Sequence, residues 1–215
     1  MQPLMLDLTS RARHVVALGA HPDDIEIGCG GTLLRLAASV PGLTVEFVVA
    51  TGDPLRLEEA RHSAQLFLPG HEVAVRAGGL PDGRLPAFWS ETKELLEEAA
   101  RGRQVDLVLA PRVDDAHQDH RTVAEIVPTV WRDHLVLGYE IPKWDGDLGR
   151  PALYVTLSDE LVREKVLRLS KAFPSQASRD WFDDDVFLGL ARLRGMECRA
   201  KYAEAFTAAK AVLAW

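Results

Sequence analysis

The sequence has few cysteines, no excess of positive charge and no long apolar run. Its two cysteines, Cys29 and Cys198, lie far apart, which excludes a disulfide scaffold and a four-thiolate metal site and favours a reducing, cytoplasmic setting. The 25 Lys and Arg residues against 32 Asp and Glu leave a net charge of −7, so nucleic acid is not an expected partner. No stretch approaches the ~20 apolar residues of a membrane span, and Met1 to Arg13 lack the apolar core of a signal peptide. We therefore expect a soluble protein.

Length and composition indicate one folded domain. The chain has 215 residues, of which 47% are hydrophobic and 27% charged, the balance of an ordinary globular protein. A chain of this length buries about 70% of its unfolded surface without disulfide bonds. We expect residues 1–215 to form a single domain.

Short apolar runs alternate with segments that have helical spacing of apolar residues. The runs predict strands over 14–20, 44–51, 71–76, 106–110, 135–141 and 154–157, and the periodic segments predict helices over 33–40, 58–68, 89–101, 122–131, 159–171 and 186–199. Such alternation is typical of an α/β fold: a doubly wound, Rossmann-like, mostly parallel sheet with helices on both faces. In these sheets ligands bind at the carboxyl ends of the strands, so a metal site is expected in the loops that follow them.

The first strand candidate ends in a turn that carries one imidazole and two adjacent carboxylates. Residues 20–32 read AHPDDIEIGCGGT, and Pro22 is compatible with a first helical turn. Asp24 lies three residues after His21 and can point to the same side, whereas Asp23 is rotated about 100° away. One acid can therefore bind a metal while the other stays free.

A second group of acids and histidines follows the strand candidate 106–110. It runs from Asp114 to His120 with the sequence DDAHQDH. His117 and His120 are three residues apart and share one face of a helical turn, and Asp119 can fix the orientation of a neighbouring imidazole. Both groups therefore follow strands, where this architecture gathers its ligands.

Two histidines and one carboxylate form a common ligand set for catalytic zinc, with one coordination position left for water. His21, Asp24 and His120 supply such a set. An ion held there polarises a carbonyl and makes water a nucleophile at neutral pH. Asp23, the remaining acid, is the candidate general base. We expect His117, supported by Asp119, to stabilise the oxyanion of amide hydrolysis and to protonate the departing amine.

These residues also allow other interpretations. The HPDD turn can be a helix cap with an Asp as the capping residue. The glycines around Cys29 do not have the spacing of a dinucleotide-binding loop, and Cys29 fits a small buried residue better than a nucleophile. The tryptophans at 89, 144 and 181 suit either sugar stacking or core packing, and none is assigned.

At these motifs the sequence resembles the PIG-L or LmbE-like family of zinc-dependent N-deacetylases. Residues 20–32 are similar to the first family motif and residues 117–120 to the second, and three further segments, at 56–60, 80–85 and 201–206, are similar as well. The resemblance implies that His21, Asp24 and His120 bind the metal. It also implies that Asp23 is the base and that His117 is the electrostatic helper. It also implies that Arg56 and Asp82 bind substrate, and that Zn²⁺ is the cofactor, with Fe²⁺ as the alternative.

The activity that this resemblance implies is removal of an N-acetyl group from an N-acetylglucosamine-type amino sugar or glycoconjugate, with release of acetate. The expected partner is therefore a small N-acetylated sugar, and a homo-oligomer is left open. Two alternatives remain: an amidase of the same family that acts on thiol conjugates, and a non-catalytic sugar-binding relative. The second is disfavoured because a binding protein has no use for a base beside the metal.

Overall fold

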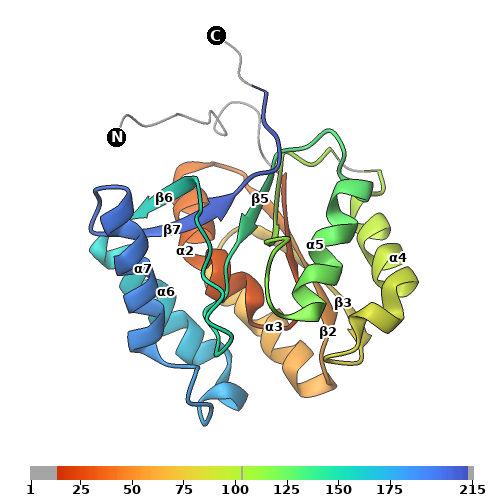
Figure 1. Ribbon diagram of the computed structural model, residues 1–215, viewed down its shortest axis with the longest axis horizontal. Helices are drawn as coiled ribbons and strands as arrows, with labels where there is room; N and C mark the ends of the chain where they lie inside the picture. The colour runs from red at the N-terminus through yellow and green to blue at the C-terminus, as the bar shows by residue number, and fades with distance from the viewer. Residues whose placement is uncertain (1–13, 103, 213–215) are drawn as a thin grey trace.

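The computed structural model describes residues 14–102 and 104–212, and within them seven strands form one mixed sheet in the order β3-β2-β1-β4-β5-β7-β6 (Figure 1). The strands are β1 (His14–Gly19), β2 (Thr44–Thr51), β3 (Glu72–Leu80), β4 (Leu107–Pro111), β5 (Val136–Tyr139), β6 (Leu153–Leu157) and β7 (Tyr202–Thr207). The pairs β1–β2, β2–β3, β1–β4 and β4–β5 are parallel. This confirms the predicted doubly wound, mostly parallel α/β fold.

Helices cover both faces of the sheet. They are α2 (Asp24–Ser39), α3 (Pro54–Phe67), α4 (Trp89–Ala100), α5 (Gln118–Val130), α6 (Asp159–Ala172) and α7 (Asp184–Glu197), with short 3-10 turns at Leu85–Phe88 and Pro174–Gln176. Alternate residues of β1 point to opposite faces: Val15 and Ala17 join a core with α2, α3, α6 and α7, whereas Val16 and Leu18 pack with α4 and α5. Because both faces are covered, β1 is buried along its whole length.

The sheet differs from the prediction at one edge. The segment Tyr202–Thr207 was not expected to be a strand, yet it runs antiparallel between β5 and β6. The sequence YAEAFT contains two alanines and a buried Glu204, so it lacks the apolar run that marked the other strands. Pairing with two neighbours that are distant in sequence makes this segment a strand.

Helix α2 begins nine residues earlier than the predicted 33–40 and is broken inside. Cys29 has non-helical angles, φ −143° and ψ 17°, so the motif residues form one short helical piece and the leucines form another. Glu204 of β7 caps the second piece: its carboxylate accepts hydrogen bonds from the Gly31 amide at 2.8 Å and the Thr32 amide at 2.6 Å. Lys165 donates to the Ile27 carbonyl at 2.6 Å and to Glu204 at 2.7 Å. A buried ion pair therefore holds the break and sets the direction of the piece that begins at Asp24.

The strand order places the two histidine-bearing motifs side by side. From β1 the chain proceeds outward through β2 and β3, and it then returns to add β4 on the other side of β1. In doubly wound folds ligands bind at the point where the strand order reverses, at the carboxyl ends of the strands. Here that point lies between β1 and β4, whose following loops carry the two motifs.

Candidate functional site

His21 lies in the turn between β1 and α2, which β2 holds in place. The carbonyl of Ala20 accepts two hydrogen bonds from Thr51, one from the amide at 2.9 Å and one from the hydroxyl at 2.7 Å. The turn is closed by the Asp24 carboxylate, which accepts from the His21 amide at 2.8 Å. The first motif is thus fixed by its own helix start and by the neighbouring strand.

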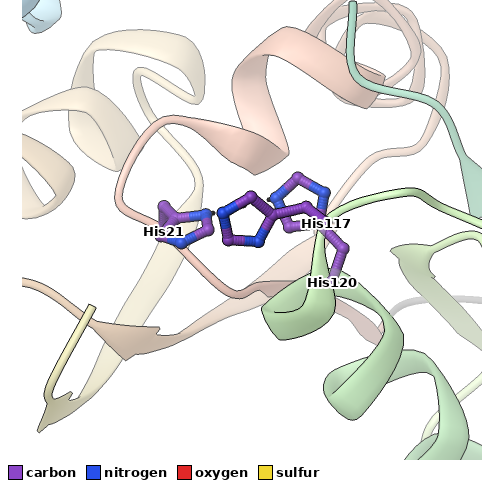
Figure 2. A group of neighbouring side chains, drawn as sticks. All are labelled: His21, His117 and His120. Carbon is purple, nitrogen blue, oxygen red and sulfur yellow. Dashed lines mark hydrogen bonds between the residues drawn. The ribbon is translucent and has the colours of Figure 1, made fainter. Parts of the chain in front are cut away.

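Figure 2 shows His21 from the β1–α2 turn meeting His117 and His120 from the start of α5. Nδ1 of His21 lies 3.2 Å from Nε2 of His120. The Asp24 carboxylate reaches both rings, with Oδ2 at 3.4 Å from Nδ1 of His21 and Oδ1 at 3.2 Å from Nε2 of His120. The structure therefore brings together two ring nitrogens and a carboxylate from segments about a hundred residues apart.

The two ring nitrogens and the Asp24 carboxylate lie close enough together to surround one tetrahedral metal ion. Bonds of about 2.0–2.2 Å in tetrahedral geometry separate neighbouring ligand atoms by about 3.3–3.6 Å. The two ring nitrogens are 3.2 Å apart, and each has a different Asp24 oxygen nearby: Oδ2 lies 3.4 Å from His21 and Oδ1 lies 3.2 Å from His120. Ring nitrogens and a carboxylate oxygen are also the donor types that zinc binds. His21, Asp24 and His120 could thus hold a divalent ion.

The electrostatics of the three residues favour a positive charge at this point. Burial alone would lower the pKa of His120, but Asp24 and Asp115 outweigh it and raise that pKa to about 9. The pKa of His21 is likewise raised, because Asp24 and its other acidic neighbours exceed the effect of burial. Burial would raise the pKa of Asp24, yet the imidazoles of His120 and His21 hold it well below its usual range. A cation bound here would replace protons that the acids otherwise hold on the rings.

Asp115 fixes the orientation of His120, a role that the sequence analysis missed. Its Oδ1 lies 3.0 Å from Nδ1 of His120 and accepts the His117 amide at 2.8 Å, while Oδ2 pairs with Lys143 at 2.8 Å. These contacts lower the pKa of Asp115 to about 2 against the effect of its burial. A carboxylate behind a histidine ligand is the usual outer support of a metal site, and here it would leave Nε2 of His120 available to bind an ion. The signal in the sequence was the acid pair Asp114 and Asp115 directly before the histidines.

Asp119 is placed differently from the prediction that it supports His117. Its buried carboxylate accepts hydrogen bonds from the Gly83 amide at 2.7 Å and the Leu85 amide at 3.0 Å, and it lies 3.4 Å from Nε2 of His21. It therefore anchors the 81–85 loop and stands behind His21. Chain packing explains this difference. The loop after β3 brings two backbone amides within hydrogen-bond distance of the Asp119 carboxylate, which binds them instead of the His117 ring.

His117 is half-buried at the N-terminus of α5. Its Nδ1 accepts the Asp119 amide at 3.2 Å, so the neutral ring carries its proton on Nε2. The ring centroid lies 4.8 Å from that of His21 and 4.9 Å from that of His120. Burial and the positive charge of these two neighbours lower the pKa of His117. The ring is thus a neutral hydrogen-bond donor at neutral pH.

Asp23 lies beside the three donors and is 3% exposed. It occupies the N-cap position of α2, but its side chain makes no capping hydrogen bond, so the capping interpretation does not explain it. Oδ1 lies 2.9 Å from a guanidinium nitrogen of Arg56, and Oδ2 is buried without a hydrogen-bond partner. Burial raises the pKa of Asp23, and Arg56 offsets only part of this rise. A carboxylate with a raised pKa and a free oxygen is suited to accept a proton.

Arg56 and Asp82, the predicted substrate-binding residues, both border this cluster. Arg56 stands in the first turn of α3 and faces Asp23. Asp82 is exposed in the loop after β3, and its carboxylate lies 3.0 Å from Nε2 of His21. Two further groups have ligand atoms within 4.8 Å of one another: the three histidines 21, 117 and 120, and His21 with Asp82 and Asp119. We favour the set with Asp24 because its donors are largely buried.

The architecture and the site together define an α/β protein with a histidine and aspartate cluster at the switch point of its sheet. The family model described as PIG-L, GlcNAc-PI de-N-acetylase, matches residues 16–131, so the chain belongs to the PIG-L family of deacetylases. A relative from Escherichia coli (strain K12), uncharacterized deacetylase YaiS, is 28% identical over 181 residues, which cover 78% of this chain and 94% of the relative.

Solved structures share the fold at low identity. N,N'-diacetylchitobiose deacetylase from Pyrococcus horikoshii superposes with a TM-score of 0.72 at 22% identity, covering 95% of this chain and 86% of that one. GalB, the 4-carboxy-2-hydroxymuconate hydratase from Pseudomonas putida KT2440, superposes with a TM-score of 0.75 at 16% identity, covering 94% and 98%. Because this fold also carries a hydratase, the fold alone does not select a reaction. No helix in the described part of the chain is long and apolar enough to cross a membrane.

Proposed function

We propose that this protein is a zinc-dependent amide hydrolase that removes the N-acetyl group from an N-acetylglucosamine-type amino sugar or glycoconjugate and releases acetate. The observation that carries the proposal is the convergence of His21, Asp24 and His120 at 3.2–3.4 Å with Asp23 buried beside them. Three ligands leave a fourth position open for water or substrate, which is the arrangement of catalytic rather than structural zinc. The family relationship supports the same reaction class.

The residues divide into ligands, a proton acceptor and a hydrogen-bond donor. His21, Asp24 and His120 would hold the metal, which would supply Lewis-acid polarisation of the amide carbonyl and a water nucleophile near pH 7. Asp23 accepts the proton of the attacking water on its free oxygen. Arg56 holds the other oxygen of Asp23 and so keeps the carboxylate turned to one side.

His117 stabilises the oxyanion through the proton on Nε2. The lowered pKa of His117 makes this ring a poor source of the second proton, which the departing amine requires. Asp23 has just taken up a proton and has a raised pKa, so we assign the transfer to the amine to Asp23. Of the two roles expected for His117, we keep the stabilisation of the oxyanion and reassign the protonation of the amine. Asp119 and Asp82 contact Nε2 of His21, the ring nitrogen that is not assigned to the metal, and they orient the ring through this contact.

The test is an acetate-release screen over N-acetylglucosamine derivatives, combined with metal analysis of the purified protein. Asp23→Asn should keep the metal and lose about 10²–10⁴-fold in turnover, the range for a general acid–base residue. Asp24→Ala should lose the metal. The exposed Asp133→Asn serves as the control and should change neither.

Three results would separate the alternatives. Full activity in Asp23→Asn would refute the base assignment. Hydrolysis of thiol-conjugate amides but not of N-acetyl sugars would indicate the other amidase activity, because the two reactions share all the metal chemistry and differ in the substrate pocket. A metal-bound protein that releases no acetate from any substrate would favour a non-catalytic binding protein.

A further inference from the structure

Three apolar side chains are exposed on the two loops that follow the neighbouring strands β4 and β5. Val113, in the loop between β4 and α5, is 63% exposed, and Trp144 and Leu148, in the loop between β5 and β6, are 74% and 43% exposed. We call these three residues the apolar platform. A tryptophan that is three-quarters exposed does not contribute to the core, so the core-packing interpretation of Trp144 is wrong.

Buried charges hold the two loops together. Arg112 pairs with Asp147 at 2.9 Å, and Lys143 pairs with Asp115 at 2.8 Å and with Asp147 at 2.9 Å. In addition, the Ala116 amide donates to the Asp147 carboxylate at 2.7 Å. Each platform residue is the chain neighbour of one of these charged residues. We call these ion pairs and this hydrogen bond the frame. Because the frame restrains both loops, less conformational entropy is lost when a ligand binds to the platform.

The frame joins the platform directly to the site. Asp115, which accepts from Lys143 with one oxygen, contacts Nδ1 of His120 with the other at 3.0 Å. Both loops leave the carboxyl ends of neighbouring strands, and Ala116, just before α5, contacts Asp147 of the β5–β6 connection. Trp144, adjacent to Lys143 in the chain, thus lies at the same edge of the sheet as the three metal-binding candidates.

We propose that the apolar platform binds an apolar aglycone, attached to the amino sugar whose N-acetyl group is removed. This inference rests on the proposed function and specifies its substrate class. Val113 and Leu148 offer no hydrogen-bonding group and Trp144 offers only its indole N–H, so the platform suits an apolar group better than a second sugar rich in hydroxyls. A stable dimer buries about 800 Å² per partner, whereas one tryptophan and two aliphatic side chains expose far less.

The experiment measures binding, so that it does not depend on turnover. Zinc-loaded Asp23→Asn protein is titrated calorimetrically with phenyl and with methyl N-acetyl-β-glucosaminide. We expect the phenyl glycoside to bind more tightly, and we expect Trp144→Ala in this background to reduce the phenyl-over-methyl preference about tenfold. Trp144→Phe should retain most of the preference. Leu167→Ala, which truncates a 48% exposed leucine on α6, is the matched control and should leave it unchanged.

Several results would overturn the inference. Equal affinity of the parent for both glycosides would do so, as would an unchanged preference in Trp144→Ala. A fall in molecular mass of Trp144→Ala by light scattering would show that a second copy of the chain covers the platform instead. Failure of the proposed function is a separate result, since it is read from acetate release by the protein with Asp23 intact.

Discussion

Replacing Glu204 with glutamine removes one partner of the buried ion pair that holds the break in α2. The side chain of Lys165 is 6% exposed and that of Glu204 is 4% exposed, so the remaining ammonium would stay buried without its counter-charge. Breaking such a pair from one side costs about 3–5 kcal/mol. For a chain of this size each kcal/mol lowers Tm by about 2–4 °C, so we expect a fall of roughly 6–20 °C. The amides of Gly31 and Thr32 would also lose their charged acceptor.

The assay is thermal and urea unfolding of Glu204→Gln, Lys165→Met and the double variant, all in chelator. The double variant should lose less stability than the sum of the two single losses, because it leaves no unpaired buried charge. Asp159→Asn, which removes the exposed pair with Lys201, is the control and should change the free energy of unfolding by about 1 kcal/mol or less. The idea that a buried ion pair stabilises this break would be refuted if Glu204→Gln lost no more stability than Asp159→Asn. Strict additivity of the two single losses in the double variant would also refute it.

Two further predictions concern the surroundings of the metal site. Asp115→Asn should weaken zinc binding about 10–100-fold in a competition titration with a chromophoric chelator, because His120 loses its supporting carboxylate; the exposed neighbour Asp114→Asn should not, and equal effects would argue against the support. Burial raises the pKa of Glu26 from 4.5 to about 8, so in chelator its contribution to stability is present below pH 4.5 and is lost as the pH rises through about 8. Glu26→Gln should therefore reduce the fall in the free energy of unfolding, measured with urea, between pH 5 and 8. An unchanged dependence on pH would contradict a raised pKa of Glu26.

Much of the fold could be predicted because its signals are local. The apolar run of β1 and the helical spacing in α6 are properties of short windows, and both elements were predicted within a few residues of their observed bounds. Strand β7 and the early start of α2 could not be predicted in this way. A hydrogen-bonded neighbour strand makes the first a strand, and Glu204, 173 residues from Gly31, supports the helix after its break.

The sequence by itself determined which residues meet within a turn: His21 with Asp24, three positions apart, and the histidines at the start of α5. It also placed both motifs after strands, because strands of this length and composition are recognisable without a partner. Only the tertiary structure decided which carboxylate supports which imidazole, with Asp115 on His120 and Asp119 behind His21. The physical reason is that a buried carboxylate takes the partner that chain packing brings within hydrogen-bond distance. For Asp119 these are amides of a loop about 35 residues away, joined through the order of the strands.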